Sequence, residues 1–535
     1  MKLLDKVIAP IDKALERFDP IWQAEHGTGG QRSRYYDKTG VAKYREWRGV
    51  KDTFTDYVAW LNNLCSMAMM VASAPVPCLK GFWEYRWMGS YLGTFMFIDR
   101  LFEGYRGDNL KIAHMNMHAI VKSLTKKIAY ILANDQRLGG GPDTEKIIPH
   151  DEIIPPLFLR GFKELTPIPL QTLPEFIICD IDQHIEPYYI DVAESFGLPG
   201  DVCSRCAAET GIAFDDAFPI LGKIMLSSNM PCNASEATSM FQRRRIGLPD
   251  FQFTMAMQHT TQEGKEYSQQ ILKDAVAFIE EHYGVKYDWN ELFKYAALMN
   301  EQNEIEMEKW DIFATPYSAL SGIAETLYKL YEWQSANGSD SYFNEVDRKV
   351  IEIMRRDYEN KVVPFGGRTR HRAFIWGPSA VYYTDFPTWA QNCWGICVVL
   401  NMDSTMGYNH IDTEDPEKAL WDLTEFSQRA CMRHHAVGGW DNINAVWDWA
   451  KRFNCDMIIC NDNVACKGMN GVHAALEEQA KDYGMHWIWL EHDLEDSRTI
   501  SRQDMRRCVN NYCSVVLNEQ PLDPTIVEFD DSEAF

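Results

Sequence analysis

The stretch MIICNDNVACKGMNG, residues 457–471, sets the fold of the C-terminal part of this chain. Its first four residues form a short apolar run bounded by polar residues, which predicts a buried strand. A polar loop follows, and helical spacing continues through 472–483. A second apolar run, WIWLE at 487–491, comes next. The order strand, helix, strand predicts two parallel neighbours in one sheet.

The same alternation extends over residues 366–535. Apolar runs bounded by turns predict strands at 373–377, 396–401, 457–460 and 487–491, and helical spacing predicts helices at 417–433, 442–451, 472–483 and 502–517. Strands that alternate with helices form a parallel sheet covered on both faces. We therefore expect residues 366–535 to be one α/β half of the molecule.

Residues 166–365 predict a second half of the same kind, enlarged by helices. Strands are predicted at 176–181, 224–229 and 251–257, and long amphipathic helices at 264–283, 289–310, 315–334 and 342–359. Residues 1–165 are predicted to be mainly helical, with helices over 53–70 and 111–133. The predicted fold class is α/β, with two parallel-sheet halves and a mainly helical N-terminal region.

Composition and charge narrow the possible partners. The chain has 535 residues, 46% hydrophobic and 24% charged, with a net charge of −24. A chain this acidic has no overall attraction for phosphate backbones or anionic lipids, so we expect neither nucleic acid nor membrane as a partner. The longest uncharged run, 57–79, contains Asn and Pro and predicts a buried helix. No targeting signal is apparent, which favours a soluble, cytoplasmic protein.

Four of the 14 cysteines hold special positions. Cys232 and Cys466 each follow a predicted strand, at the sheet edge where open α/β sheets bind ligands. Cys203 and Cys206 form CSRC at the mouth of a predicted helix, where anions are favoured. The spacing alone leaves three readings open: a thiolate-bound metal cluster, a lone CxxC redox pair, and buried thiols.

Charged residues near these cysteines give weaker signals. Arg243, Arg244 and Arg245 form a cationic run that suits either a clamp on substrate phosphates or a solvated helix end. Glu209 and Glu236 lie close to the cysteines in sequence, and either carboxyl has the chemistry of an acid or a base. The sequence assigns no catalytic acid or base.

Longer motifs give a family resemblance. Residues 447–517 resemble the C-terminal part of the 2-hydroxyacyl-CoA dehydratase family, which includes benzoyl-CoA reductase subunits. The matching segments are MIICND, NVACKGMNG, AALEEQAKDYG, HWIWLEHDLEDSR and ISRQDMRRCVNN. Upstream, LPGDVCSRCAAETG, IMLSSNMPCNASEATSMFQ and AFIWGPSAVYYTDFP are similar to further family segments in the same order. The resemblance covers about residues 170 to 520.

The resemblance implies a cofactor and partners. It implies two Rossmann-like halves and a [4Fe–4S] cluster held by Cys203, Cys232 and Cys466, with Cys206 as the fallback for the first ligand. It also implies an acyl-CoA substrate, a second related subunit in a heterodimer, and an ATP-dependent iron–sulfur activator protein. The arginine run would then contact coenzyme A phosphates.

The implied activity is radical dehydration of a 2-hydroxyacyl-CoA to a 2-enoyl-CoA through a ketyl radical. The proton removed from C3 is hardly acidic, and its pKa is too high for any general base tuned by burial to remove it. Two alternatives stay open. One is a low-potential reductase of an aromatic acyl-CoA or another small unsaturated substrate, and the other is a non-catalytic partner subunit.

Overall fold

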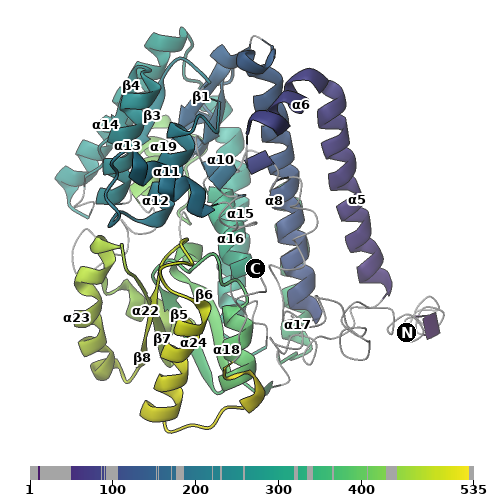
Figure 1. Ribbon diagram of the computed structural model, residues 1–535, viewed down its shortest axis with the longest axis vertical. Coiled ribbons are helices and arrows are strands. Elements are labelled where there is room, and N and C mark those ends of the chain that lie inside the picture. The colour runs from purple at the N-terminus through teal and green to yellow at the C-terminus, as the bar shows by residue number, and fades with distance from the viewer. Residues whose placement is uncertain are drawn as a thin grey trace.

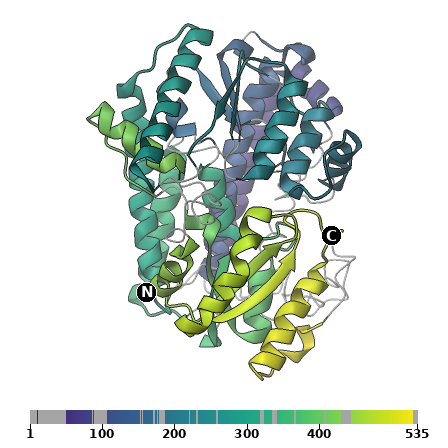
Figure 2. The same cartoon turned by 90° about the vertical axis from the view of Figure 1, so that its left-hand side faces the viewer.

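The computed structural model shows two α/β halves stacked along the long axis of the molecule, with a group of helices alongside them (Figures 1 and 2). It describes residues 10–11, 50–85, 87–88, 91, 107–141, 143–151, 154, 156–169, 172–175, 177, 186–219, 221–228, 232–256, 260–317, 323–333, 341–363, 367–405, 408–428 and 443–528.

The second half confirms the predicted parallel sheet. Its strands are β5 (His371–Trp376), β6 (Ile396–Asn401), β7 (Met457–Asn463) and β8 (His486–His492), in the order β6-β5-β7-β8 with every pair parallel. All four strands appear where the apolar runs predict them. Strand β6 is buried at each of its residues, because helices cover both faces of a parallel sheet.

The first half contains a sheet of the same kind. Its strands are β1 (Ile147–His150), β2 (Thr166–Pro169), β3 (Met225–Ser228) and β4 (Asp250–Phe253), all parallel, in the order β2-β1-β3-β4. The predictions at 224–229 and 251–257 are confirmed by β3 and β4.

The sequence does not predict β1 and β2, because both contain proline, which cannot donate to a ladder and argues against a strand. The register shows how the central strand β1 tolerates Pro149: its pairing with β3 is confined to His150↔Leu226. The strand predicted at 176–181 lies outside the described residues except for Ile177. The domain boundary after residue 165 stays a prediction, with β1 before it and the other strands of this sheet after it.

Helices occupy most of the remaining described chain. They are α5 (Val50–Ser73), α6 (Pro75–Glu84), α8 (Gly107–Asn134), α9 (Pro156–Leu159), α10 (Thr172–Glu175), α11 (Glu186–Ser195), α12 (Ser204–Phe214), α13 (Asn233–Ile246), α14 (Gln262–Tyr283), α15 (Trp289–Phe313), α16 (Ile323–Tyr331), α17 (Ser341–Glu359), α18 (Phe386–Trp394), α19 (Pro416–Gln428), α22 (Ala445–Arg452), α23 (Lys467–Tyr483) and α24 (Arg502–Asn511). Short 3₁₀ or π turns lie at Gln136–Leu138, Asp143–Lys146, Met402–Thr405, Tyr512–Val516 and Pro524–Ile526.

The two sheets share one topology. Counted within its own half, each sheet has the strand order 2-1-3-4. This order reverses direction between the first and third strands, and ligands in open α/β sheets bind at such a switch point, beyond the carboxyl ends of the strands. The switch points here lie between β1 and β3 and between β5 and β7.

Helix α15 joins the halves. Near its start, the Asp288 amide donates to the Gly161 carbonyl in the first half at 2.8 Å. Near its end, the Trp310 ring packs edge-on against Trp449 in the second half, with centroids 5.0 Å apart. A helix of 25 residues spans about 37 Å, enough to extend along both halves.

The N-terminal region is mainly helical where the structure describes it, as predicted, although it includes strand β1, and its apolar run is not buried. Helices α5 and α6 pack on α8 and leave large apolar side chains exposed, among them Tyr57 at 64% and Trp83 at 90%. The predicted burial of 57–79 is therefore wrong, because only one side of α5 has a neighbour among the described elements (Figure 1).

The described residues contain no single helix long and apolar enough to cross a bilayer. Tyr57–Ser73 and Pro75–Glu84, which meet at an angle of 108°, are together long and apolar enough for a broken span, judged by length and composition alone.

The packing of α11 on α12 depends on a glycine. A Cβ atom on Gly211 would lie 1.8 Å from the Tyr189 carbonyl oxygen. We expect Gly211→Ala to lower the free energy of unfolding by about 3 kcal/mol or more, as for a severely overpacked core. Urea denaturation followed by circular dichroism measures this.

Gly471→Ala is the matched control, because a Cβ atom at this helical glycine of α23 meets nothing within 4 Å. It should stabilise by about 0.5–1 kcal/mol. Equal effects of the two substitutions would contradict the close helix contact.

Candidate functional site

Three of the predicted ligand cysteines occupy the same kind of position. Cys203 is the N-cap residue of α12, Cys232 of α13 and Cys466 of α23. The first amides of a helix have no partner within the helix and favour negative charge nearby. The amides therefore act in favour of a thiolate at each of the three positions, whereas burial acts against it.

The fold brings these thiols together from distant parts of the chain. Cys203, Cys206, Ala234 and Leu494 form one buried cluster, and Cys232 packs against it. The charges of Cys203 and Cys232 both raise the pKa of Cys466. Only groups close to Cys466 can have this effect. The helix starts that follow β3 and β7 in the two halves thus meet at one place.

The local environment separates the thiols of CSRC. The hydrogen bond from Cys206 lowers the pKa of Cys203 against the effect of burial, and the pKa of Cys206 is raised by that same bond and by burial. The Nδ2 atom of Asn463 donates to the Cys203 sulfur at 3.9 Å. Cys203 is therefore the thiol of this pair that more readily becomes a ligand.

Cys466 is governed by burial and by backbone amides. Burial raises its pKa to about 12, while N–H groups of Met469 and Gly468 act in the opposite direction. Such amides point at the sulfur from the first turn of α23. Hydrogen bonds of this kind tune the potential of thiolate-bound clusters.

The donor set fits an iron–sulfur cluster better than a single ion. Within the described part of the chain, only His371, Asp456 and His486 place three potential ligand atoms all within 4.8 Å of one another. The sulfurs of Cys203, Cys232 and Cys466 therefore do not all lie within 4.8 Å of one another. A cluster of several irons is held by thiolates on different irons, which requires wider spacing.

A buried ion pair joins the two halves beside these thiols. The Arg205 guanidinium of α12 donates to Glu495, which follows β8, at 2.7 Å, and both side chains are at most 10% exposed. The Glu495 amide donates to the Ser204 hydroxyl at 3.1 Å. On the solvent side, Lys467 pairs with Asp201 at 2.5 Å. The Arg205–Glu495 pair and the Lys467–Asp201 salt bridge flank the cysteines and hold the two halves in one relative position.

Glu186 adds a second carboxyl to this contact. It begins α11 and is fully buried. Burial, followed by the negative charge of Glu495, raises the pKa of Glu186 well above its usual range. Sequence analysis missed Glu186, Arg205 and Glu495, since no local pattern marks a charged residue that tertiary contacts bury.

The structure does not bring the arginine run to the cysteines. Arg243, Arg244 and Arg245 lie in the last turn of α13, and Cys232 caps its first turn. Arg243 pairs with Asp250 at 2.8 Å, Arg245 pairs with Asp216, and Arg244 is exposed. Of the two candidate carboxyls, Glu209 is buried and its charge acts on Cys206, whereas Glu236 is exposed.

A small cavity lies at the carboxyl edge of the second sheet. It holds about 20 Å³ and is lined by Ser379, Asn401 and Asn461 among apolar residues that include Tyr383 and Phe386. Asn401 donates to the Ser379 hydroxyl at 2.5 Å. These polar groups lie at the β5–β7 switch point, where the fold places ligands. Ser379 lies in the segment AFIWGPSAVYYTDFP, which carries part of the family resemblance, but no sequence signal singles out Ser379 or the two asparagines.

The raised pKa of Glu186 predicts a stability that depends on pH. Its folded-state pKa is raised, so the folded chain binds one proton more than the unfolded chain above about pH 4.5. The free energy of unfolding should fall as pH rises from there, by at most about 1.4 kcal/mol per pH unit. Glu186→Gln should remove this loss and be more stable than the native chain at pH 7 by about 1–3 kcal/mol.

Urea titrations from pH 4 to 8 measure this gap, which should shrink toward zero at pH 4. Glu194→Gln, an exposed site on the same helix, controls for the loss of a carboxyl. A gap of constant size across the range would show that Glu186 is ionised in the folded protein.

Comparison with known proteins identifies the family. The model of the family 2-hydroxyglutaryl-CoA dehydratase, D-component, matches residues 174–509, which include all four cysteines of the site and strands β3 to β8. None of the curated proteins matches the chain. The matched region exceeds half of the 535 residues. The chain therefore belongs to the 2-hydroxyglutaryl-CoA dehydratase D-component family, within the 2-hydroxyacyl-CoA dehydratases.

Proposed function

We propose that this chain is the iron–sulfur subunit of a radical 2-hydroxyacyl-CoA dehydratase. The observation that carries the proposal is the meeting of three N-cap cysteines at one place, two of them from the equivalent switch-point loops of the two halves. Cys203, Cys232 and Cys466 would hold a [4Fe–4S] cluster, with Cys206 as the alternative first ligand.

Three protein ligands would leave one position open for a substrate oxygen or water. When bound, the cluster supplies a low-potential electron to the thioester of the substrate. The chain's own groups do the rest. Amides of α23 donate to the Cys466 sulfur, burial keeps water from the thiols, and the Arg205–Glu495 pair keeps the two halves in place.

The proposed reaction removes water from C2 and C3 of a 2-hydroxyacyl-CoA. One electron added to the thioester gives a ketyl radical anion, which expels the 2-hydroxyl as hydroxide. The C3 proton becomes acidic and is lost to a base. The resulting radical returns the electron, so the balance is loss of one water with no net oxidation.

We propose that the acyl group of the substrate binds in the cavity beside Ser379, Asn401 and Asn461. It offers hydroxyl and amide groups that suit a hydroxyl or thioester oxygen, within apolar walls. Its present volume of about 20 Å³ requires widening on binding. The proposed contact of the arginine run with coenzyme A phosphates rests mainly on Arg244, because Arg243 and Arg245 are paired with aspartates.

The proposal includes two protein partners. The family is that of a named D-component, which implies a further component, and we propose a related second subunit in a heterodimer. The exposed apolar side chains of α5 and α6 support such an interface, since monomers rarely expose apolar patches of this kind. We also propose an ATP-dependent iron–sulfur activator that delivers the starting electron.

The cluster is tested by analysis of protein purified without oxygen. We expect about four iron and four sulfide per chain and a brown colour. Cys203→Ser, Cys232→Ser or Cys466→Ser should each remove most of the iron, because each deletes one of three ligands. Cys508→Ser and Cys65→Ser, outside the site, should not. An active protein free of iron would overturn the proposal.

The reaction is tested with the partner subunit, the activator, ATP, a strong reductant and a 2-hydroxyacyl-CoA. We expect 2-enoyl-CoA with many products per electron supplied, because the electron is returned after each turnover. A reduced product, at one per two electrons, would establish the reductase alternative. If the rate and the product were unchanged when this chain is omitted, that result would establish a non-catalytic role.

A further inference from the structure

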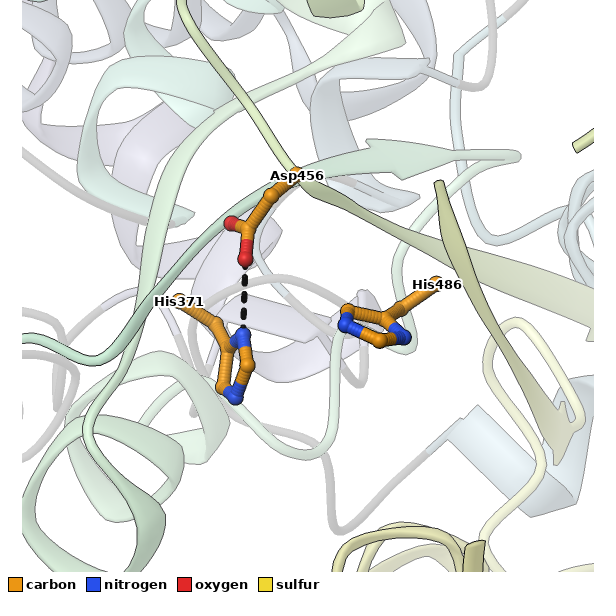
Figure 3. Close-up of side chains that lie close together, drawn as sticks. All are labelled: His371, Asp456 and His486. Atoms are coloured by element: carbon orange, nitrogen blue, oxygen red, sulfur yellow. Dashed lines mark hydrogen bonds and ion pairs between the residues drawn. The ribbon is translucent and has the colours of Figure 1, made fainter. Parts of the chain in front are cut away.

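A second group of metal-binding side chains lies at the opposite edge of the second sheet. His371 is the first residue of β5 and His486 the first of β8, while Asp456 immediately precedes β7. Strands β5, β7 and β8 are consecutive neighbours in the sheet, so these residues meet at its amino edge (Figure 3). The cysteines lie beyond the carboxyl edge of the same sheet, so the two groups are separate.

The three side chains face one another. The His371 Nδ1 atom lies 2.7 Å from the Asp456 carboxylate. The His486 ring stands beside the His371 ring, with centroids 5.3 Å apart and planes at 88°, and one of its nitrogens turns toward the pair (Figure 3). One potential ligand atom from each residue lies within 4.8 Å of the other two.

The surroundings match those of metal ligands. The other ring nitrogen of His371 hydrogen-bonds to the Glu519 carboxylate at 3.0 Å. The second oxygen of Asp456 accepts the Arg372 amide at 2.7 Å. Histidines that bind metals usually donate their remaining N–H to a carboxylate, and ligating carboxylates are themselves hydrogen-bonded.

We propose that His371, Asp456 and His486 bind one divalent transition-metal ion of the zinc type, with water completing the coordination. Imidazole and carboxylate ligands favour Zn²⁺, Co²⁺ or Ni²⁺, whereas Mg²⁺ and Ca²⁺ prefer oxygen alone. Zinc–nitrogen bonds of about 2.0–2.1 Å require the imidazole of His486 to move inward from its present position. The His371 nitrogen beside Asp456 then binds the ion, and Glu519 fixes that ring.

The ion would link the ends of three strands to the C-terminal segment, residues 517–528. Glu519 belongs to this segment, and the Leu522 amide of the same segment donates to the Cys393 carbonyl at 2.7 Å. The competing arrangement has a proton in place of the ion, with His371 as an imidazolium between Asp456 and Glu519. Arg370, which pairs with Glu519 at 3.3 Å, is the other cation beside that carboxylate.

Cobalt titration of the full chain distinguishes the two arrangements. We expect His486→Ala to bind one Co²⁺ fewer per chain than the unchanged protein, as measured by equilibrium dialysis. The difference spectrum should show ligand-field bands without the near-ultraviolet charge-transfer band of thiolates, because no cysteine belongs to this site. His410→Ala, an exposed histidine elsewhere, is the control and should bind as many ions as the unchanged protein.

Glu519→Gln keeps all three ligands but weakens the support of His371. It should lower the affinity for Co²⁺ at this site by about 10–100-fold without changing the number of ions bound. Zn²⁺ should raise the melting temperature of the unchanged protein more than that of His486→Ala. Equal ion counts for the unchanged protein and His486→Ala, or a thiolate band in the difference spectrum, would overturn the proposal.

Discussion

The constraint behind this architecture is that every described strand runs parallel to its sheet neighbours. A parallel strand must be followed by a crossover, usually a helix, that returns the chain to the other end of the sheet. The carboxyl ends of all strands therefore meet at one edge, where the next helices begin with unpaired amides. Cys232 and Cys466 occupy this place after the third strand of their halves, so one topology used twice supplies two equivalent thiols.

The second requirement is that the two halves face each other at these edges. Arg205 and Glu495 form a buried pair across this contact, and the charge of Glu495 contributes to the raised pKa of Glu186 beside it. Buried ion pairs add little net stability compared with apolar packing, but removing one partner costs about 3–5 kcal/mol. Such a pair favours one relative placement of the halves over others. That placement is what brings the thiols of α12 and α13, which pack on each other within the first half, to the thiol of α23.

The second sheet offers different donors at its two edges. Its carboxyl edge carries a thiol at a helix N-cap, within a buried and largely apolar cluster. Its amino edge carries two imidazoles and carboxylates beside the C-terminal segment. Thiolates suit iron–sulfur clusters, while imidazole with carboxylate suits a single divalent ion. The two roles proposed here, redox chemistry and structural fastening, thus fall at opposite ends of the same strands.

The sequence by itself determined the elements whose signal is local. Strand β6 is continuously apolar because both faces are buried, and its bounds follow directly from residues 396–401. The cysteines at 203, 232 and 466 stood out because each precedes a helix, and the family motifs surround them. Only the tertiary structure revealed β1, whose Pro149 argues against a strand, and the exposure of α5. It alone paired Arg205 with Glu495, 290 residues apart, and His371 with Asp456, 85 apart, because burial and partners depend on contacts that no local pattern records.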